Sequence, residues 1–95
     1  MKREVIGKRE RKIYKNHDPT ELDYIMVESV VVEPYTPETE RMKQKLQRRF
    51  NKTKVWKLSI VTRYKGINRA VEEVACGLYP TKQEAIEAGR KILRR

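Results

Sequence analysis

The densest run of functional side chains in this sequence consists of lysines and arginines. Residues 41–54 hold seven basic residues and no acidic one, and residues 55–69 add four more basic residues without a carboxylate. Cations gathered on one surface bind polyanions, because each phosphate contact is weak alone and counterion release accumulates over all of them. The candidate phosphate-binding residues are Arg41, Lys45, Arg48, Arg49, Lys52, Lys54, Lys57, Arg63, Lys65 and Arg69.

Histidine and cysteine, which commonly carry catalysis or bind metals, occur once each. His17 is the one histidine and Cys76 the one cysteine. A zinc site or an activated nucleophile needs partners at a set spacing, and no glycine-rich phosphate loop is present either. We therefore expect no enzymatic activity, cofactor, metal or small-molecule substrate. His17 is interpreted as a turn residue and Cys76 as a small core residue.

Composition indicates one small folded domain with a heavily charged surface. The chain has 95 residues, of which 38% are hydrophobic and 38% charged, with a formal net charge of +10. This length suits a single domain, and such an excess of positive charge attracts polyanions without helping the fold. No apolar run reaches the length of a membrane span, and one cysteine cannot form an internal disulfide. We expect a cytoplasmic protein without membrane contact.

Charge is segregated along the chain. Residues 1–16 are mainly basic and are interpreted as a mobile basic arm or an edge strand, followed by a single α+β domain over residues 17–95. Residues 17–40 hold seven acidic residues and no lysine or arginine. Two interpretations follow for this acidic block. It either leaves the basic tract free for a ligand or lies against it and neutralises it.

The basic tract requires a helix and a strand to position it. A β-branched run over 23–33, ended by Pro34, predicts a strand. Thr36 as cap and Pro37 at the first helical position then predict a helix over 37–50. Its apolar residues are spaced by four, which gives one narrow stripe and leaves the remaining surface polar or basic. That stripe consists of Met42, Leu46 and Phe50.

The second half of the chain predicts a hairpin followed by a helix. In the strand over 54–65, one alternating set is expected to face the core: Trp56, Leu58, Ile60, Thr62 and Tyr64. The other set is expected to face solvent: Val55, Lys57, Ser59, Val61, Arg63 and Lys65. A turn at 66–68 leads to a strand over 69–78, with a bulge or an edge position at the two adjacent glutamates. Thr81 opens the last helix, where Gly89 predicts a close approach to the sheet.

One motif in this half has a familiar pattern. A strand carrying Trp56 is followed by a turn with Gly77, Tyr79 and Thr81, and then by a helix that opens with Glu84-Ala85. Over residues 54–95 this resembles AP2-type DNA-binding domains and the arm-type domains of tyrosine recombinases. The resemblance implies that cations on an open sheet face contact the major groove. By position, those cations are Lys57, Arg63, Lys65 and Arg69, and Glu72 and Glu73 depart from the pattern.

Together these patterns predict an α+β fold. We expect a three-stranded, mainly antiparallel sheet and two helices in the order β-α-β-β-α, with a fourth strand if the N-terminal residues add to an edge. The predicted function is nucleic-acid binding through phosphate contacts with limited sequence specificity, with double-stranded DNA favoured over RNA. The alternative is a small viral or mobile-element interaction module that binds an acidic partner or self-associates as a homodimer.

Overall fold

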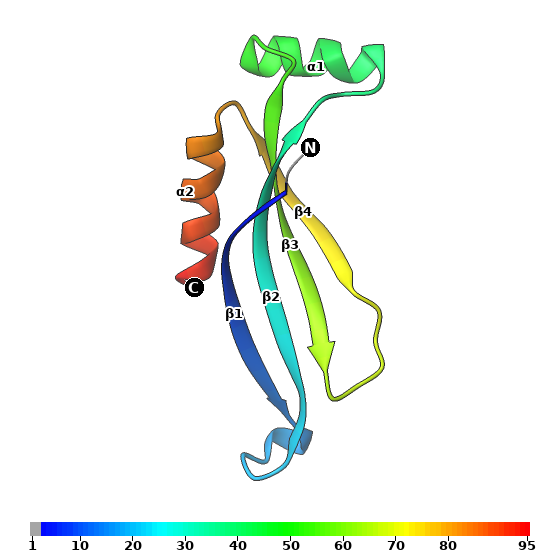
Figure 1. Ribbon diagram of the computed structural model, residues 1–95, viewed down its shortest axis with the longest axis vertical. Helices are drawn as coiled ribbons and strands as arrows, with labels where there is room; N and C mark the ends of the chain where they lie inside the picture. The colour runs from blue at the N-terminus through cyan, green and yellow to red at the C-terminus, as the bar shows by residue number, and fades with distance from the viewer. Residues whose placement is uncertain (1–2) are drawn as a thin grey trace.

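The computed structural model describes residues 3–95 and confirms an α+β fold built on an antiparallel sheet. The sheet has four strands in the spatial order β1-β2-β3-β4. Figure 1 shows these long strands with one helix beside the sheet and one across its end. Along the chain the elements are β1 (Glu4–Tyr14), the short 3-10 helix η1 (Lys15–His17), β2 (Leu22–Tyr35), α1 (Glu40–Phe50), β3 (Val55–Lys65), β4 (Glu72–Tyr79) and α2 (Lys82–Leu93).

The predicted order β-α-β-β-α lacked one strand. Residues of the expected N-terminal arm form β1, which pairs with β2 along its whole length, from Glu4 opposite Val32 to Tyr14 opposite Leu22. The chain therefore runs β-β-α-β-β-α, and β1 is one edge of the sheet. The first two residues of that predicted arm lie outside the described residues.

Two predicted boundaries around α1 need correction. Pro34 does not end β2, because it still pairs with Trp56 of β3. β1 pairs with β2 only as far as Val32, so at Pro34 the strand β2 has one hydrogen-bonded neighbour, β3. The missing N–H of this proline therefore does not break hydrogen bonding on both sides of β2. The helix begins at Glu40, where the Thr39 side chain accepts a hydrogen bond from the backbone N–H of Met42.

Helix α2 packs on one face of the sheet, as the apolar pattern predicts (Figure 1). We call this the helix-covered face, and its buried core residues are Val30, Val32, Leu58 and Ala85. Gly89 is buried here, against β1 and the centre of the sheet. The Thr81 hydroxyl and Glu84 form the expected capping interaction, because Thr81 Oγ1 accepts from the Glu84 N–H and donates to Glu84 Oε2.

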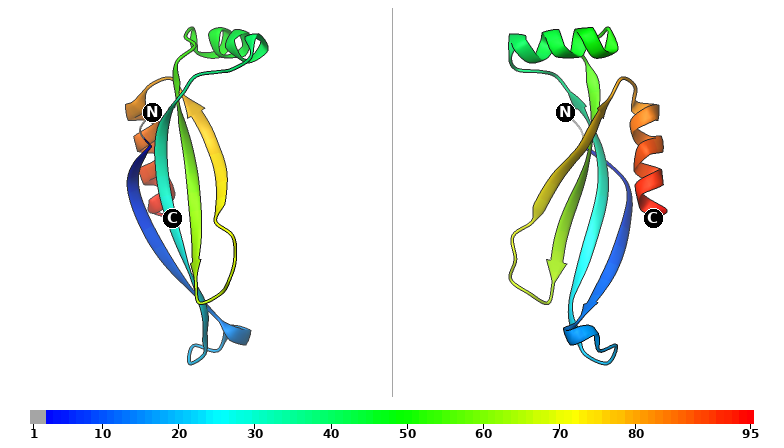
Figure 2. Two further views of the ribbon diagram at one scale, coloured as in Figure 1. Left: turned by 45° about the vertical axis from the view of Figure 1, so that its right-hand side comes forward. Right: turned by 180° about the vertical axis from the view of Figure 1, so that it is seen from behind.

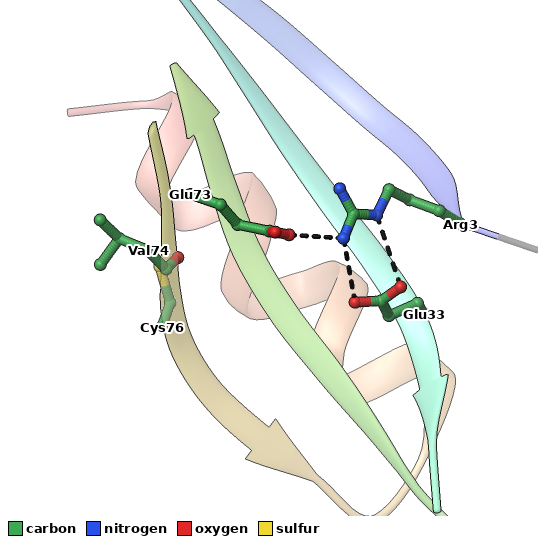
Figure 3. Close-up of polar contacts among 5 residues, drawn as sticks. All are labelled: Arg3, Glu33, Glu73, Val74 and Cys76. Atoms are coloured by element: carbon green, nitrogen blue, oxygen red, sulfur yellow. Dashed lines mark hydrogen bonds and ion pairs between the residues drawn. The ribbon is translucent and has the colours of Figure 1, made fainter. Parts of the chain in front are cut away.

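Among residues 3–95, neither helix lies along the opposite face of the sheet, which we call the open face (Figure 2). Its β3 residues are Val55, Lys57, Ser59, Val61, Arg63 and Lys65. The prediction that this set faces solvent is wrong for Val55, Ser59 and Val61, which are buried. Long side chains from neighbouring strands meet above this part of the sheet and shield it (Figure 3). Alternation alone cannot distinguish a bare face from one that is covered by long polar side chains.

The second hairpin is looser than predicted. Six residues, 66–71, connect β3 to β4, and Gly66 takes a positive φ of 95° at its start. β4 is the other edge of the sheet, which confirms the edge position expected for Glu72 and Glu73. The register of β3 with β4 shifts between Leu58 and Ser59. Cys76 lies at that bulge and is exposed, so its predicted place in the core is wrong.

Candidate nucleic-acid interface

Helix α1 and the loop that follows it carry the largest group of candidate cations. The helix lies across one end of the sheet and points away from α2 (Figures 1 and 2). Asn51 ends it in the left-handed conformation, with a φ of 57°. We name six exposed residues the α1 cluster: Arg41, Lys45, Arg48, Arg49, Lys52 and Lys54.

Three members of the α1 cluster form one stripe along the helix. Arg41, Lys45 and Arg48 are spaced by four and three residues, so their side chains lie on the same side of α1. Within residues 3–95, none of the three donates a hydrogen bond to a side chain or forms an ion pair. Arg49 stacks over the Phe50 ring at 5.0 Å, and Lys52 donates to the Pro80 carbonyl at 2.9 Å.

The acidic block of residues 17–40 does not neutralise the basic tract. Glu28 pairs with Arg9 on β1, and Glu33 pairs with Arg3. Glu40 lies 4.0 Å from Lys43, its neighbour on α1, which is not among the ten candidate residues. Asp18 accepts two hydrogen bonds from Thr20, which lowers the pKa of this carboxyl. Among residues 3–95, none of the ten candidate cations forms an ion pair with a carboxylate of this block.

Of the four candidate residues outside the α1 cluster, Lys57 lies near α1 and the other three do not. Lys57 is half-buried on the open face near α1, opposite Glu33 in the sheet register. Arg63 and Lys65 are at the other end of β3, about 26 and 33 Å from its first residue at about 3.3 Å per residue. Arg69 lies beyond them, where it pairs with Glu72 and stacks over Tyr64 at 4.7 Å.

Sequence reasoning missed two cations on β1. Ile25 of β2 pairs with Lys12 on one side and Lys65 on the other, so these two lysines lie in one row across the sheet. Lys8 lies on the same face, in the row next to that of Arg63. We name Lys8, Lys12, Arg63 and Lys65 the far-end cluster; all four are exposed and share the open face. Glu10 lies among them and approaches Lys65 at 4.0 Å. The alternation of Lys8, Glu10 and Lys12 was the available signal, but it lacks the apolar partners that mark a strand.

An ion-pair network lies between the two clusters on the open face. Figure 3 shows the Arg3 guanidinium held by Glu33 of β2 and Glu73 of β4. The shortest N–O distances are 3.3 Å to Glu33 and 2.5 Å to Glu73. The hydrogen bond to Glu33 is the main cause that raises the pKa of Arg3 above its ordinary value. One guanidinium and two carboxylates carry one net negative charge, so this part of the face does not attract phosphate.

The aromatic residues near the basic tract have separate places. Trp56 packs against the core of the helix-covered face, with the Lys82 ammonium 5.5 Å from its ring. Tyr64 is half-buried beside Tyr24 of β2, at 6.0 Å between ring centroids. These rings are therefore not aligned into one platform with Phe50 on α1, as a series of stacked bases would require.

The described part of the chain offers little for other kinds of site. Within residues 3–95, no group of three or more His, Cys, Asp or Glu side chains is placed to hold a metal ion. Neither helix in this range has the length and apolar character needed to cross a membrane. Comparison with protein-family models, with curated proteins and with solved structures gives no match.

Proposed function

We propose that this protein binds nucleic acid through phosphate contacts, with double-stranded DNA preferred to RNA. The observation that carries the proposal is the α1 cluster, in which six exposed cations have no carboxylate partner among residues 3–95. Self-repulsion among such groups is relieved when they approach a chain of phosphates, and the released counterions add to the affinity. Two carboxylates of the acidic block, Glu28 and Glu33, pair with arginines outside this cluster, and Glu40 approaches Lys43, which is not a member of it.

The shape of α1 suits a duplex. A helix of 11 residues is about 16 Å long, and the major groove of B-DNA is about 12 Å wide and admits a helix. α1 stands across the end of the sheet (Figure 1), and the three residues of its basic stripe are exposed. Arginines and lysines at this spacing favour phosphates on either side of the groove, which supports limited sequence specificity.

The resemblance to AP2-type domains supports the same class of ligand. α2 packs on one face of the sheet and the other face carries Lys57, Arg63 and Lys65. The two glutamates that depart from the pattern are both paired, Glu72 with Arg69 and Glu73 with Arg3. Their repulsion of phosphate is thereby reduced.

The test is the salt dependence of binding to random-sequence duplex DNA, followed by fluorescence anisotropy. We expect the logarithm of the association constant to fall linearly with the logarithm of salt concentration. In the α1 variant, Arg41, Lys45 and Arg48 are replaced together by alanine. Its slope should be shallower by about 2.7, since each lost phosphate contact removes about 0.9.

The matched control removes the same charge from α2, by replacing Arg90, Lys91 and Arg94 with alanine. We expect this control to keep a slope close to that of the parent. An α1 variant that binds with the slope and affinity of the parent would show that α1 is not the binding surface. Single-stranded DNA and duplex RNA of equal length identify the preferred ligand.

Self-association is a second candidate function, favoured by edge strand β4. Val74 is 61% exposed on this strand and Val71, just before it, is 52% exposed. An unpaired strand edge with exposed apolar residues can pair with another chain. Sedimentation over a wide concentration range tests this candidate. A monomer at every concentration would reject it, and a Val74→Lys variant should abolish any dimer that forms through β4.

A further inference from the structure

The distance between the α1 cluster and the far-end cluster can be compared with the helical repeat of duplex DNA. α1 ends just before β3, and the far-end cluster lies between about 20 and 33 Å down that strand at about 3.3 Å per residue. The helix itself stands beyond the start of β3, at one end of a molecule 53 Å long. One turn of B-DNA, about 34–36 Å, falls within the range of separations that these positions span.

Both clusters border the same space. α1 projects away from α2 and so extends toward the side of the open face (Figure 2). A hollow of about 540 Å³ lies beneath it, lined by Met42 and Leu46 of α1 and by Leu78 of β4. Leu78 is paired with Lys57 and therefore belongs to the open face. A ligand that contacts α1 from this side also faces the far-end cluster.

The middle of this surface does not gather positive charge as its two ends do, because Glu33 and Glu73 offset Arg3 and the nearby Lys57. The Arg3, Glu33 and Glu73 network lies between the clusters and has a net negative charge. A ligand that matches this pattern must be rigid enough to touch both ends without following the surface between them. Duplex DNA meets that condition, because its persistence length of about 50 nm far exceeds the separation.

We propose that one chain contacts a single duplex at two places one helical turn apart, with the α1 cluster at one place and Lys8, Lys12, Arg63 and Lys65 at the other. Phosphates one turn apart lie on the same side of a duplex, so no bending is needed. This inference rests on the proposed function. It adds a second contact surface and a minimum ligand length of about one turn, or 10–11 base pairs, plus the flanking phosphates.

The experiment is a length series of hairpin-closed duplexes with stems of about 8, 12, 16 and 20 base pairs, each measured by anisotropy at fixed salt. We expect affinity to rise by roughly tenfold or more between the shortest and the longest stems, beyond the statistical gain in sites, because the second contact becomes intramolecular. The rise should then level off. An affinity that grows only in proportion to the number of sites would overturn the two-point contact.

The far-end variant replaces Lys12, Arg63 and Lys65 with alanine and is compared with the α1 and α2 variants. It should bind the shortest stem as the parent does and lose the gain at the longest stem, where its salt slope should fall by about 2.7. The α1 variant should be weaker at every length. Thermal unfolding of each variant verifies its fold.

The outcomes separate the two proposals. If the far-end variant keeps the full length dependence, the second contact is wrong and the proposed function stands. If the parent binds no duplex at any length, both are wrong. An equal gain with single strands of matching length would overturn the helical-turn spacing, since a flexible strand has no fixed phosphate repeat.

Discussion

Replacing Gly89 with alanine tests the packing that joins α2 to the sheet. A Cβ atom at this position would lie 2.3 Å from Cδ1 of Ile6 and 2.9 Å from Cγ1 of Val30. It would also lie 3.2 Å from Cδ1 of Leu58. The Ile6 contact involves the end of a flexible side chain, but Val30 is β-branched and its rotamer is restricted. The added methyl group therefore has no space unless α2 moves.

Two opposing terms decide the size of the effect. Alanine is favoured over glycine inside a helix by about 1 kcal/mol. Overpacking a well-packed core costs about 1–3 kcal/mol. With two contacts shorter than 3.0 Å, we place the cost at the upper end of that range. The expected net loss is about 2 kcal/mol, which for a domain of this size lowers Tm by about 8 °C or more.

A double-mutant cycle measured by urea denaturation isolates the cause. Ile6→Val removes the Cδ1 atom nearest to the new methyl group, so Gly89→Ala should cost about 1 kcal/mol less in that background. Arg90→Gly and Arg90→Ala, compared with each other at an exposed position of α2, are the control for helix propensity alone. The reasoning is refuted if Gly89→Ala stabilises the protein by the full propensity gain. It is equally refuted if the cost is the same with and without Ile6→Val.

Three further predictions follow from local geometry. Thr81→Val removes the N-cap of α2 and should lower the free energy of unfolding by about 1 kcal/mol. Thr81→Ser keeps the capping hydroxyl and should keep the stability of the parent, so equal stability of the two variants would contradict the capping role. Asn51→Ala should lower the free energy of unfolding by about 1 kcal/mol, because alanine is strained at a φ of 57°, and Asn51→Gly should lower it by less. Chemical denaturation of the two variants measures this difference. Cys76 as a whole is exposed, but partial desolvation of its thiol raises the pKa of this group above its ordinary value. Alkylation followed by mass spectrometry should therefore be slower near neutral pH than for free cysteine and should accelerate as pH rises through that pKa. A rate at neutral pH equal to that of free cysteine would reject this reading of Cys76.

Local signals in the sequence determined much of the fold. The alternation from Trp56 to Tyr64 predicted β3, and Thr81 predicted the start of α2. Gly89 predicted close packing of that helix. These predictions succeeded because strand periodicity and a matched cap act on a few neighbouring residues, whereas the local signals at Pro34 and Thr36 were overridden.

Partners distant in sequence decided the remaining elements. β1 has few apolar residues, and its place depends on pairing with β2 from Glu4 to Tyr14. Burial of Ser59 and Val61 on the open face depends on side chains that arrive from other strands. Cys76 lies at a bulge on an edge strand, which the apolar sequence around it does not reveal.

The candidate site shows the same division. The sequence by itself determined that the positive charge is segregated and that α1 carries much of it. Only the tertiary structure decided that Arg63 and Lys65 lie far from α1 and that Lys8 and Lys12 join them. The physical reason is the extended strand, which converts ten residues of sequence into about 33 Å of distance while its neighbours bring remote residues within one strand spacing.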